Sequence, residues 1–441
     1  MDVGLSGVRA AVLDEDGRLL AASRRPLRPR LGRGRAELDP VTVLEAVLDA
    51  GGEAVRGSDG VEVVAICALG PAPILVDGSL EPLTPALLFS LDRRAEAESE
   101  RLGTTHDHAL PKLLWWREHE PELWRRAAVA LDVTGFLVAR LTGRPIQDTI
   151  TRADYEHATE PLPLPLGDSL EPLEQAGGLG AEIARALGLA AGTPVVAGTY
   201  DTYADLVAAG VRHPGDACVL LGSTLVIGCV VAERIDCPGL ELSSYPGAGL
   251  FLGGWTATAG AALDWFRREL GAVDEVHGLE PGAGGLLVLP YLAGERSPVW
   301  DPQASGVVVG LTLATTRAEI YRALVDGIAL SARDHVERLR AVGLEPARWR
   351  ASGGGTRDAT WLRATCDAIG APLDVVAHAG DAVGPAVLAL QASGVDVSLP
   401  VVEEVTPDSA RSARFDELYT VYRELYPATA PVLHRLTRSD A

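Results

Sequence analysis

Lysine is almost absent from this sequence, and its scarcity excludes two large classes of phosphate-handling protein. Lys112 is the only lysine among 441 residues, and it lies in the apolar stretch Leu-Pro-Lys-Leu-Leu-Trp-Trp. A Walker A loop ends in Gly-Lys-Ser/Thr, and a protein kinase needs a lysine on its third strand. A chain of this composition that binds phosphates must therefore use arginine, hydroxyl groups, backbone N–H groups and a metal ion.

An excess of positive charge is also lacking. The chain has 39 Lys+Arg and 60 Asp+Glu, so its formal net charge is 39 − 60 = −21. Nonspecific binding to nucleic acids or to anionic membranes needs a positive surface, so we expect neither partner. The arginine-rich run at residues 24–35 is interpreted as a solvated loop, and a local binding site there stays open.

Paired cysteines and long apolar segments are missing as well. The five cysteines are scattered and form no Cys-x-x-Cys pair, which disfavours zinc ribbons and redox-active dithiols. The apolar run at residues 217–232 has 16 uncharged residues, whereas a membrane span needs about 20. No basic stretch followed by an apolar one opens the chain. The sequence therefore predicts a cytoplasmic protein with reduced thiols.

The pattern of apolar residues predicts an α/β protein of two domains. Short apolar runs alternate with segments of helical periodicity, which is typical of α/β folds. We predict strands at 8–13, 18–22, 62–68 and 195–197, helices at 40–55, 91–101, 110–117, 136–141, 203–209 and 317–339, and a loop at 161–172. A second series of strand, turn and strand begins after residue 216. We therefore predict domains at 1–211 and 212–441.

Two short turns have the composition of phosphate-binding sites. In the first, Asp2 and Ser6 precede Arg9, so that a carboxylate, a hydroxyl and a guanidinium surround a glycine-containing turn. In the second, Gly222 and Ser223 separate two apolar runs. A plain hairpin turn explains either pattern by itself, and both interpretations stay open on these residues alone.

A glycine cluster and an isolated acid complete the set of candidates. The cluster at 352–355 precedes a predicted helix, whose N-terminus favours negative charge, although a tight connection explains it equally well. Asp201 directly follows a predicted strand and begins a predicted helix. It is either a helix N-cap or a catalytic carboxylate, because α/β enzymes place such acids at the carboxyl ends of strands.

Taken in order, these features resemble the FGGY family of carbohydrate kinases. The most specific match is Pro-Tyr-Leu-x-Gly-Glu-Arg-x-Pro-x-Trp-Asp-Pro at 290–302, supported by Leu-Thr-Gly at 141–143 and Asp-Gly-Ile-Ala at 326–329. The first of these stretches looks most like the xylulokinase and gluconokinase branches. The resemblance extends over nearly the whole chain, and it implies the two-domain actin-like ATPase (ribonuclease H-like) fold with a cleft between the domains.

The resemblance implies ATP-dependent phosphorylation of a hydroxyl on a small sugar, ketose or polyol. It makes Asp201 the general base, gives Asp2 a role in holding Mg²⁺, and places Ser6 and Arg9 near the γ-phosphate. The nucleotide would lie beside Gly222, Ser223, Gly260, Asp264, Gly354, Gly355 and Asp358. The sugar-side candidates are Asp92, Asp107, His108 and Thr202. ATP and the sugar are the implied partners, and a homodimer is left open.

Several positions depart from the family pattern. The chain begins almost on Asp2, so we expect either a start further upstream or a shortened first sheet. Leu5 stands where the family usually has a threonine. Ala-Leu-Gly-Pro-Ala-Pro at 68–73 replaces a polar sugar-binding segment, which leaves the acceptor unassigned. These departures motivate an alternative, a catalytically weakened nucleotide- or sugar-binding regulator on the same fold, whereas the retained Asp201 favours an active kinase.

Overall fold

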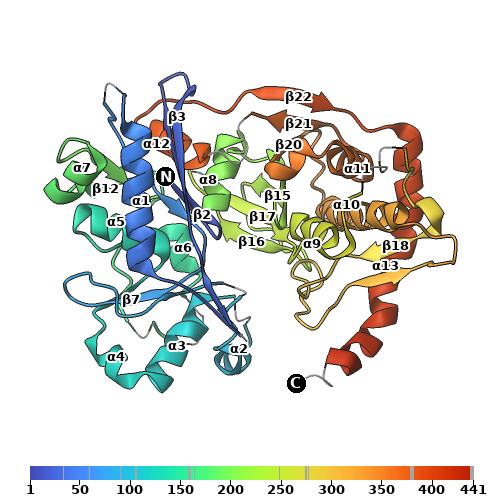
Figure 1. The fold of residues 1–441 in the computed structure, drawn as a ribbon, viewed down its shortest axis with the longest axis horizontal. Coiled ribbons are helices and arrows are strands. Elements are labelled where there is room, and N and C mark those ends of the chain that lie inside the picture. Colours follow the sequence, from blue (N-terminus) through green and yellow to red (C-terminus); the bar gives the residue numbers. More distant parts are fainter. Residues whose placement is uncertain are drawn as a thin grey trace. The chain divides into compact units, whose positions relative to one another are not determined.

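The chain folds into two compact units of mixed α/β structure (Figure 1). The first unit comprises Met1–Ala208, Ser244–Gly247 and Asp381–Leu399, and the second comprises Ala209–Ser243, Ala248–Gly380 and Pro400–Ala441. The computed structural model describes residues 1–32, 34–58, 60–89, 91–104, 107–156, 160–162, 164–247, 249–273, 276, 278–377 and 382–437. The α/β class is confirmed, and the division into 1–211 and 212–441 stays a prediction.

The first unit is built around a sheet of four strands in the order β3-β2-β1-β6. Its strands are β1 (Asp2–Gly4), β2 (Gly7–Leu13), β3 (Leu19–Pro26), β4 (Arg30–Gly32), β5 (Arg35–Leu38), β6 (Cys67–Ala68), β7 (Ile74–Val76), β8 (Ala86–Leu87), β9 (Val129–Leu131), β10 (Ile146–Asp148), β11 (Asp168–Leu170), β12 (Gln175–Gly178) and β13 (Pro194–Val196). Its helices are α1 (Pro40–Val55), α2 (Glu96–Leu102), α3 (Ala109–His119), α4 (Pro121–Arg126), α5 (Val133–Thr142), α6 (Thr149–Ala153), α7 (Ala181–Leu187), α8 (Asp201–Ala208) and α12 (Val383–Ala392).

Local signals account for the elements that the sequence predicts best. The β2–β3 hairpin forms as expected, with Arg9 opposite Arg24 in the ladder. Helix α1 has the predicted bounds because Asp39 caps it, accepting a 3.2 Å hydrogen bond from the Thr42 N–H, and Pro40 occupies its first turn. Its apolar face is buried in the core of this unit.

Three predicted elements of the first unit differ from the structure. The strand expected at 62–68 is reduced to β6, because the preceding stretch makes only an isolated bridge between Val64 and Val195. The helix expected from residue 91 begins at Glu96, since the Asp92 side chain bonds the Arg94 N–H and holds a turn there. The loop expected at 161–172 contains β11, which pairs with β10. Each difference arises from contacts that local patterning does not contain.

The second unit is built around a seven-stranded sheet in the order β16-β17-β15-β14-β20-β21-β22. Its strands are β14 (Ala217–Leu221), β15 (Leu225–Val231), β16 (Glu241–Ser244), β17 (Leu250–Trp255), β18 (Leu287–Leu289), β19 (Val307–Val309), β20 (Trp349–Ser352), β21 (Leu373–Val376) and β22 (Val401–Val405). Its helices are α9 (Gly260–Leu270), α10 (Arg317–Ala341), α11 (Ala359–Ile369) and α13 (Ser409–Thr437), with 3₁₀ turns at Ala283–Gly285 and Gly354–Arg357.

The long helix α10 forms the centre of the packing in this unit. Thr316 and Glu319 form a reciprocal capping box at its start, which satisfies N–H groups that the helix itself leaves unpaired. Its buried face belongs to the same hydrophobic core as strands β14 and β15. The predicted pair of strands within 217–232 and the predicted helix at 317–339 are both confirmed.

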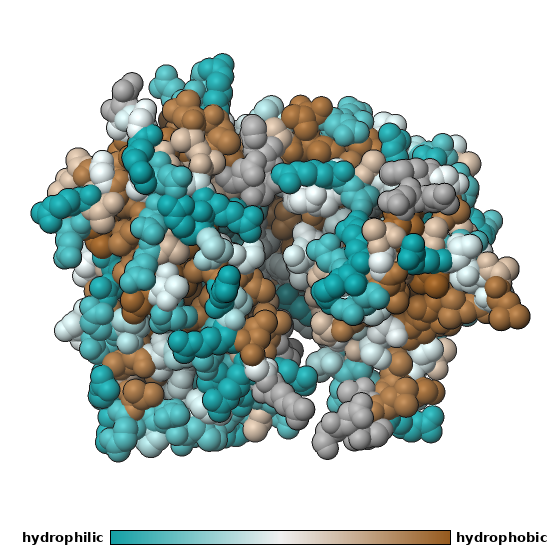
Figure 2. All heavy atoms as spheres, viewed as in Figure 1, coloured by the Kyte–Doolittle hydropathy of each residue, from teal (hydrophilic) through white to brown (hydrophobic). Residues whose placement is uncertain are grey.

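Hydrophilic and hydrophobic side chains are interspersed over the face drawn in Figure 2. Leu31, Leu313 and Leu436 are among the large apolar residues that are exposed. Within the described ranges, no helix combines the length and the apolar character that crossing a membrane requires.

Candidate active site

Asp201 begins helix α8 directly after a tight turn. Strand β13 leads into Gly198, whose φ is +71°, and a Cβ there would lie 1.9 Å from the carbonyl oxygen of Ile66. Only glycine fits such a position. The Asp201 carboxylate accepts a 2.7 Å hydrogen bond from the N–H of the half-buried Thr202. Asp201 thus follows a strand and begins a helix, as the sequence predicts.

Asp2 and Arg9 face each other across the β1–β2 hairpin. They are partners in the ladder, and Arg9 Nη2 lies 2.6 Å from Asp2 Oδ2. The other oxygen, Asp2 Oδ1, is buried and has no hydrogen-bond partner in the described part of the chain. Burial raises the pKa of Asp2, and the Arg9 charge opposes that shift. The structure therefore leaves one carboxylate oxygen of Asp2 for a cation or a donor outside this chain.

Three carboxylates of the first unit influence one another. Burial, followed by the charge of Asp2, raises the pKa of Asp201 to about 6, while Arg9 lowers it. Asp205 lies one helical turn further along α8, and burial together with the charges of Asp2 and Asp201 raises its pKa well above the usual range. A Cβ at Gly384 would lie 2.6 Å from Asp205 Oδ1, so α12 packs closely on this side of α8. Asp205 was not among the predicted residues, because its i, i+4 spacing from Asp201 places the two acids on one face only once the helix has formed.

The remaining N-terminal candidate, Ser6, lies in the exposed turn between β1 and β2. Its Oγ accepts a 3.3 Å hydrogen bond from Arg24 Nη2, and the neighbouring Leu5 is also exposed. No group of three or more His, Cys, Asp or Glu side chains in the described ranges is arranged to hold a metal ion by itself. A cation at Asp2 would therefore need ligands other than a ready-made cluster of such side chains among the described residues.

The sugar-side candidates differ in how accessible they are. Asp92 is fully buried, and its carboxylate accepts hydrogen bonds of 2.8 and 2.7 Å from Arg94 and one of 2.9 Å from the Ala36 N–H. Asp107 and His108 are half-buried and directly precede α3. Asp92 therefore orders the chain around it, and a direct contact between its carboxylate and a sugar stays a prediction.

The single lysine of the chain also lies in this region. Lys112 is fully buried, and its Nζ donates a 2.9 Å hydrogen bond to the carbonyl group of Phe89. Burial lowers the pKa of Lys112 to about 8, whereas the charges of Asp107 and Asp92 raise it. Lys112 thus forms a hydrogen bond in the interior of the first unit and is not exposed to a phosphate. This agrees with the exclusion of P-loop and protein-kinase chemistry.

In the second unit, two predicted nucleotide turns follow neighbouring parallel strands. The turn with Gly222 and Ser223 follows β14, and the cluster with Gly354 and Gly355 follows β20. The two strands pair in parallel, with Leu220 opposite Ser352. The carboxyl ends of parallel strands meet at one edge of a sheet, where α/β proteins bind ligands. The structure therefore brings these two turns together.

Backbone hydrogen bonds join the first of these turns to the start of α9. The Gly260 N–H donates a 3.0 Å hydrogen bond to the Gly222 carbonyl group, and the N–H groups of Ala259 and Ala261 donate to the Ser223 carbonyl group over 2.8 and 3.0 Å. A Cβ on Gly260 would lie 2.7 Å from the Gly222 oxygen. The turn is thus held through the main chain, and its approach to α9 depends on a glycine.

Arg267 links the two acids that the resemblance assigns to the nucleotide side. It lies 3.2 Å from Asp264 Oδ1 and 3.0 Å from Asp358 Oδ2. Asp358 also caps α11, accepting 3.1 Å hydrogen bonds from the N–H groups of Thr360 and Trp361. Arg267 was not among the predicted residues, because only the fold brings it from α9 to the start of α11.

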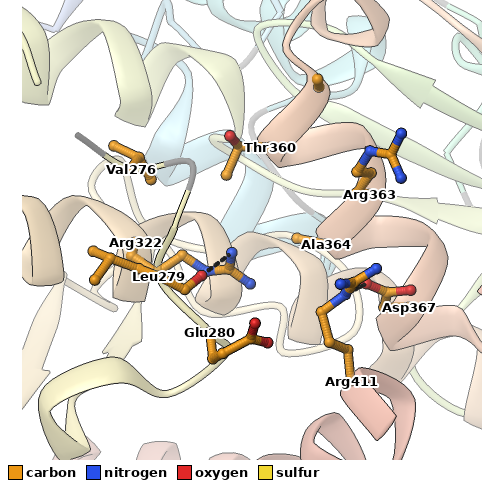
Figure 3. Close-up of a pocket in the computed structure, with 10 residues that line it drawn as sticks. Val276, Leu279, Glu280, Arg322, Thr360, Arg363, Ala364, Asp367 and Arg411 are labelled. Carbon is orange, nitrogen blue, oxygen red and sulfur yellow. Dashed lines mark hydrogen bonds and ion pairs between the residues drawn. The ribbon is translucent and has the colours of Figure 1, made fainter. Parts of the chain in front are cut away.

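A cavity of about 180 Å³ adjoins α11 in the second unit (Figure 3). Its lining residues are Val276, Leu279, Glu280, Arg322, Ala359, Thr360, Arg363, Ala364, Asp367 and Arg411. Arg411 Nε lies 2.6 Å from Asp367 Oδ2, and Arg322 donates to a backbone carbonyl group (Figure 3). Because Ala359 directly follows Asp358, the cavity adjoins the nucleotide-side residues.

Comparisons with known proteins identify the family. Residues 1–157 match the N-terminal domain of the FGGY family of carbohydrate kinases, and residues 242–393 match its C-terminal domain. Together these matches cover more than half of the chain. The chain belongs to the FGGY family of carbohydrate kinases.

Relatives of this FGGY chain match it along nearly its whole length. The xylulose kinase of Staphylococcus epidermidis is 26% identical, with 97% of this chain and 96% of the relative covered. The crystal structure of a xylulose kinase from Brucella ovis has a TM-score of 0.89 at 26% identity, covering 98% and 99% of the two chains. A ligand-bound xylulose kinase from Lactobacillus acidophilus, with a TM-score of 0.90 at 20% identity over 99% of both chains, shares the fold.

This FGGY protein is a carbohydrate kinase, a phosphotransferase whose acceptor is a sugar hydroxyl group. The predicted family, the two-domain α/β fold and the enzyme class are confirmed, and ATP is the phosphoryl donor used by the family. The alternative of a regulator without turnover receives no support from these relatives.

Proposed function

We propose that this protein transfers the γ-phosphoryl group of ATP to a hydroxyl group of a xylulose-like ketose, with Asp201 as the general base. The single observation that carries the proposal is the Asp201 carboxylate at the start of α8, whose pKa is raised to about 6 by burial and by Asp2. A carboxylate with that pKa is ionised at neutral pH and is basic enough to accept a proton.

In the proposed reaction, the Asp201 carboxylate accepts the proton of the acceptor hydroxyl as its oxygen bonds to the γ-phosphorus. The bond between the γ-phosphorus and the β,γ-bridging oxygen breaks, and ADP leaves. Ser6 and Arg9 are assigned to the γ-phosphate, where a guanidinium stabilises developing charge. The turn at Gly222 and Ser223 is assigned to the remaining phosphates.

The residues around the adenosine are proposed on the same basis. Gly260 allows close approach of the backbone at Gly222, a Cβ on Gly354 would meet nothing within 4 Å, and Gly355 leaves room for Trp361 of α11. Asp264 and Asp358 are held in place by Arg267. This arrangement favours recognition of the nucleoside by main-chain groups and by two fixed carboxylates.

Asp2 fits a role in holding Mg²⁺. Its Oδ1 is buried without a hydrogen-bond partner in the described ranges, and Mg²⁺ prefers carboxylate oxygens. Such ions are usually bound by one or two carboxylates together with substrate phosphates and water, so a single carboxylate suffices. When bound, the ion would neutralise charge on the phosphate oxygens.

The acceptor class rests on the relatives. Proteins named xylulose kinase match this chain over nearly its full length at 22–28% identity, which supports a ketopentose. The sugar-side candidates Asp92, Asp107, His108 and Thr202 all lie in the first unit, together with Asp201. We propose that Asp107, His108 and Thr202 contact the sugar and that Asp92 orders the chain behind them.

Replacement of the base tests this function. We expect Asp201→Asn to lower kcat with xylulose by about 10²- to 10⁴-fold, because a positioned base typically contributes that much. ATP affinity, measured by calorimetry, should stay close to that of the wild type, since the nucleotide-side residues lie in the second unit. Normal turnover by Asp201→Asn would refute the assignment of the base.

A panel of acceptors tests the substrate class. ADP release is measured with xylulose, other pentuloses, polyols and sugar acids, each at matched concentrations. We expect the highest kcat/KM with a ketopentose. A preference for a sugar acid or a polyol would leave the base in place but would overturn the acceptor class.

A further inference from the structure

The residue directly before the proposed base, Tyr200, is fixed on two sides. Only 8% of its surface is exposed, and its hydroxyl group donates a 2.6 Å hydrogen bond to Asp154 Oδ2. Its ring lies against Gly70, where a Cβ would come within 2.0 Å of Tyr200 Cε1. Any movement of Tyr200 would therefore move the first residue of α8, Asp201, with it.

The segment that lies on this ring is itself fastened at both ends. The Ala68 N–H donates a 3.3 Å hydrogen bond to the Thr199 carbonyl group. The Ala72 N–H donates a 2.7 Å hydrogen bond to the buried Asp132, which also accepts one of 3.1 Å from the Tyr155 hydroxyl group. Residues 68–72 and the turn before Asp201 are thus joined into one layer of the first unit.

Asp154 connects this layer to a second loop. Its carbonyl group accepts a 3.3 Å hydrogen bond from the N–H of Ala109, the first residue of α3. Asp107 and His108 directly precede that residue. The hydrogen bond between Tyr200 and Asp154 therefore links three segments of the chain: residues 68–72, residues 107–109 and the start of α8.

We propose that Tyr200 and Asp154 are positioning residues for the sugar acceptor. The inference rests on the proposed function, in which Asp201 is the base and Asp107 and His108 contact the sugar. Transfer requires the acceptor oxygen and the base to be aligned closely, and a misplacement of about 1 Å can cost about 10²-fold in rate. A short hydrogen bond to a carboxylate is well suited to hold such an alignment, because it is stronger than a neutral one.

Tyr200→Phe tests the proposal while keeping the ring against Gly70. We expect kcat/KM for the sugar to fall by about 10- to 100-fold, as expected for loss of a hydrogen bond to a charged group. The KM for ATP should not change. We also expect more ADP than sugar phosphate to be formed, since a misplaced acceptor lets water compete for the phosphoryl group.

Variants of Asp154, which accepts the hydrogen bond from Tyr200, make the test specific. Asp154→Asn retains an oxygen that accepts from the Tyr200 hydroxyl group, so its kinetics should lie closer to the wild type than those of Asp154→Ala. The double variant Tyr200→Phe/Asp154→Ala should lose no more activity than the more affected single variant, because both remove the same hydrogen bond. Losses that add would overturn the proposal.

Tyr422→Phe is the matched control. It removes a hydroxyl group from a buried pair with Tyr291, 3.1 Å apart, in the second unit. We expect a comparable change in stability but unchanged kinetics for the sugar. If Tyr422→Phe and Tyr200→Phe impair the sugar kinetics equally, the positioning role is overturned.

Amide hydrogen exchange provides a readout that does not depend on turnover. In Tyr200→Phe we expect faster exchange in peptides that contain residues 68–72 and Ala109, and no change there in Tyr422→Phe. Unchanged exchange rates would show that the Tyr200–Asp154 hydrogen bond does not hold these segments together, whether or not sugar is phosphorylated. Conversely, wild-type kinetics in Tyr200→Phe combined with loss of turnover in Asp201→Asn would overturn the positioning role alone and leave the proposed function intact.

Discussion

The two units hold their candidate site residues by different physical means. In the first unit, the groups are acids of low exposure: the buried Asp2 and the half-buried Asp201 and Asp205 influence one another, with Arg9 as the cation that pairs with Asp2. In the second unit, main-chain hydrogen bonds hold the turn at Gly222 against Gly260, and Gly355 leaves room for the side chain of Trp361.

The two kinds of site are therefore sensitive to different substitutions. Buried carboxylates lose hydration, so their pKa values rise, and each needs a partner or a ligand to be stable in its charged form. A glycine turn buries no charge, but it tolerates no side chain where two backbones meet. Changes of charge should therefore affect the first unit most, and additions of a single methyl group should affect the second.

Among the changes that compare the two units, the largest effect is expected for Asp2→Asn. It removes the charge that pairs with Arg9 and that, in the proposed function, holds Mg²⁺, so kcat should fall by about 10²- to 10³-fold, as for other losses of preorganised electrostatic stabilisation. Steady-state kinetics over a range of Mg²⁺ concentrations measure the effect. Asp16→Asn, in an exposed turn, is the control and should be unaffected. Near-normal turnover by Asp2→Asn would mean that the charges of the first unit are not essential.

The next largest effect concerns a buried acid of the second unit, Glu295. Burial raises its pKa to about 8, although it accepts hydrogen bonds of 2.7 and 2.8 Å from the N–H groups of Ala257 and Arg296. Between its usual pKa of 4.5 and about 8 the folded protein holds a proton that the unfolded chain has lost. Stability should therefore fall as pH rises through this range, by on the order of a few kcal/mol.

Glu295→Gln isolates this contribution because glutamine keeps an oxygen for both N–H groups. Urea unfolding at pH 5 and pH 8 measures the fall in stability for both proteins. We expect a smaller fall in the variant than in the wild type. If the stability of both proteins depended on pH in the same way, Glu295 would not be an acid whose pKa is raised by burial. Acids with a raised pKa would then be a feature of the first unit's candidate site and not of Glu295.

Gly355→Ala should destabilise the second unit moderately. A Cβ there would lie 2.2 Å from Trp361 Cζ3 and 2.8 Å from Leu221 Cβ, so the core must shift, at a cost of about 1–3 kcal/mol. Gly354→Ala is a matched control in the same turn, since a Cβ there would meet nothing within 4 Å. Thermal unfolding without ligand compares the two. Equal melting temperatures would contradict the role given to close packing at Gly355.

The smallest effect is expected for Ser223→Ala. The hydrogen bonds that join this turn to α9 use the Ser223 carbonyl group, which the substitution retains. Stability should therefore change by less than about 0.5 kcal/mol, as for most surface substitutions. Calorimetry with ATP should show only a modest loss of affinity. A large loss of stability would mean that side chains, too, hold the nucleotide side.

The second unit was the easier one to predict from sequence. Its turns consist of glycines and hydroxyl residues between strongly apolar runs, and the order of strand, turn and helix places them at one edge of a sheet. The candidates Gly222, Gly260, Gly354 and Asp358 accordingly lie near one another through α9, α11 and the neighbouring strands.

The first unit was harder because its important contacts join distant residues. Tyr200 and Asp154 are separated by 46 positions, and nothing local marks them as partners. Asp92 illustrates the same limit: the resemblance makes it a sugar-side candidate, and only the fold shows that its carboxylate accepts hydrogen bonds from Arg94 and the Ala36 N–H. Asp205 was overlooked because its spacing from Asp201 has meaning only once the helix is oriented.

The sequence by itself determined the family, the alternation of strands and helices, and the places where glycine and an isolated acid interrupt them. These are local properties, set by backbone freedom and by the periodicity of apolar residues. Only the tertiary structure decided which charges share an interior and which hydroxyl group meets which carboxylate. Those contacts depend on the folding of the chain over tens of residues, and the energy of a charge depends on what surrounds it rather than on its neighbours in sequence.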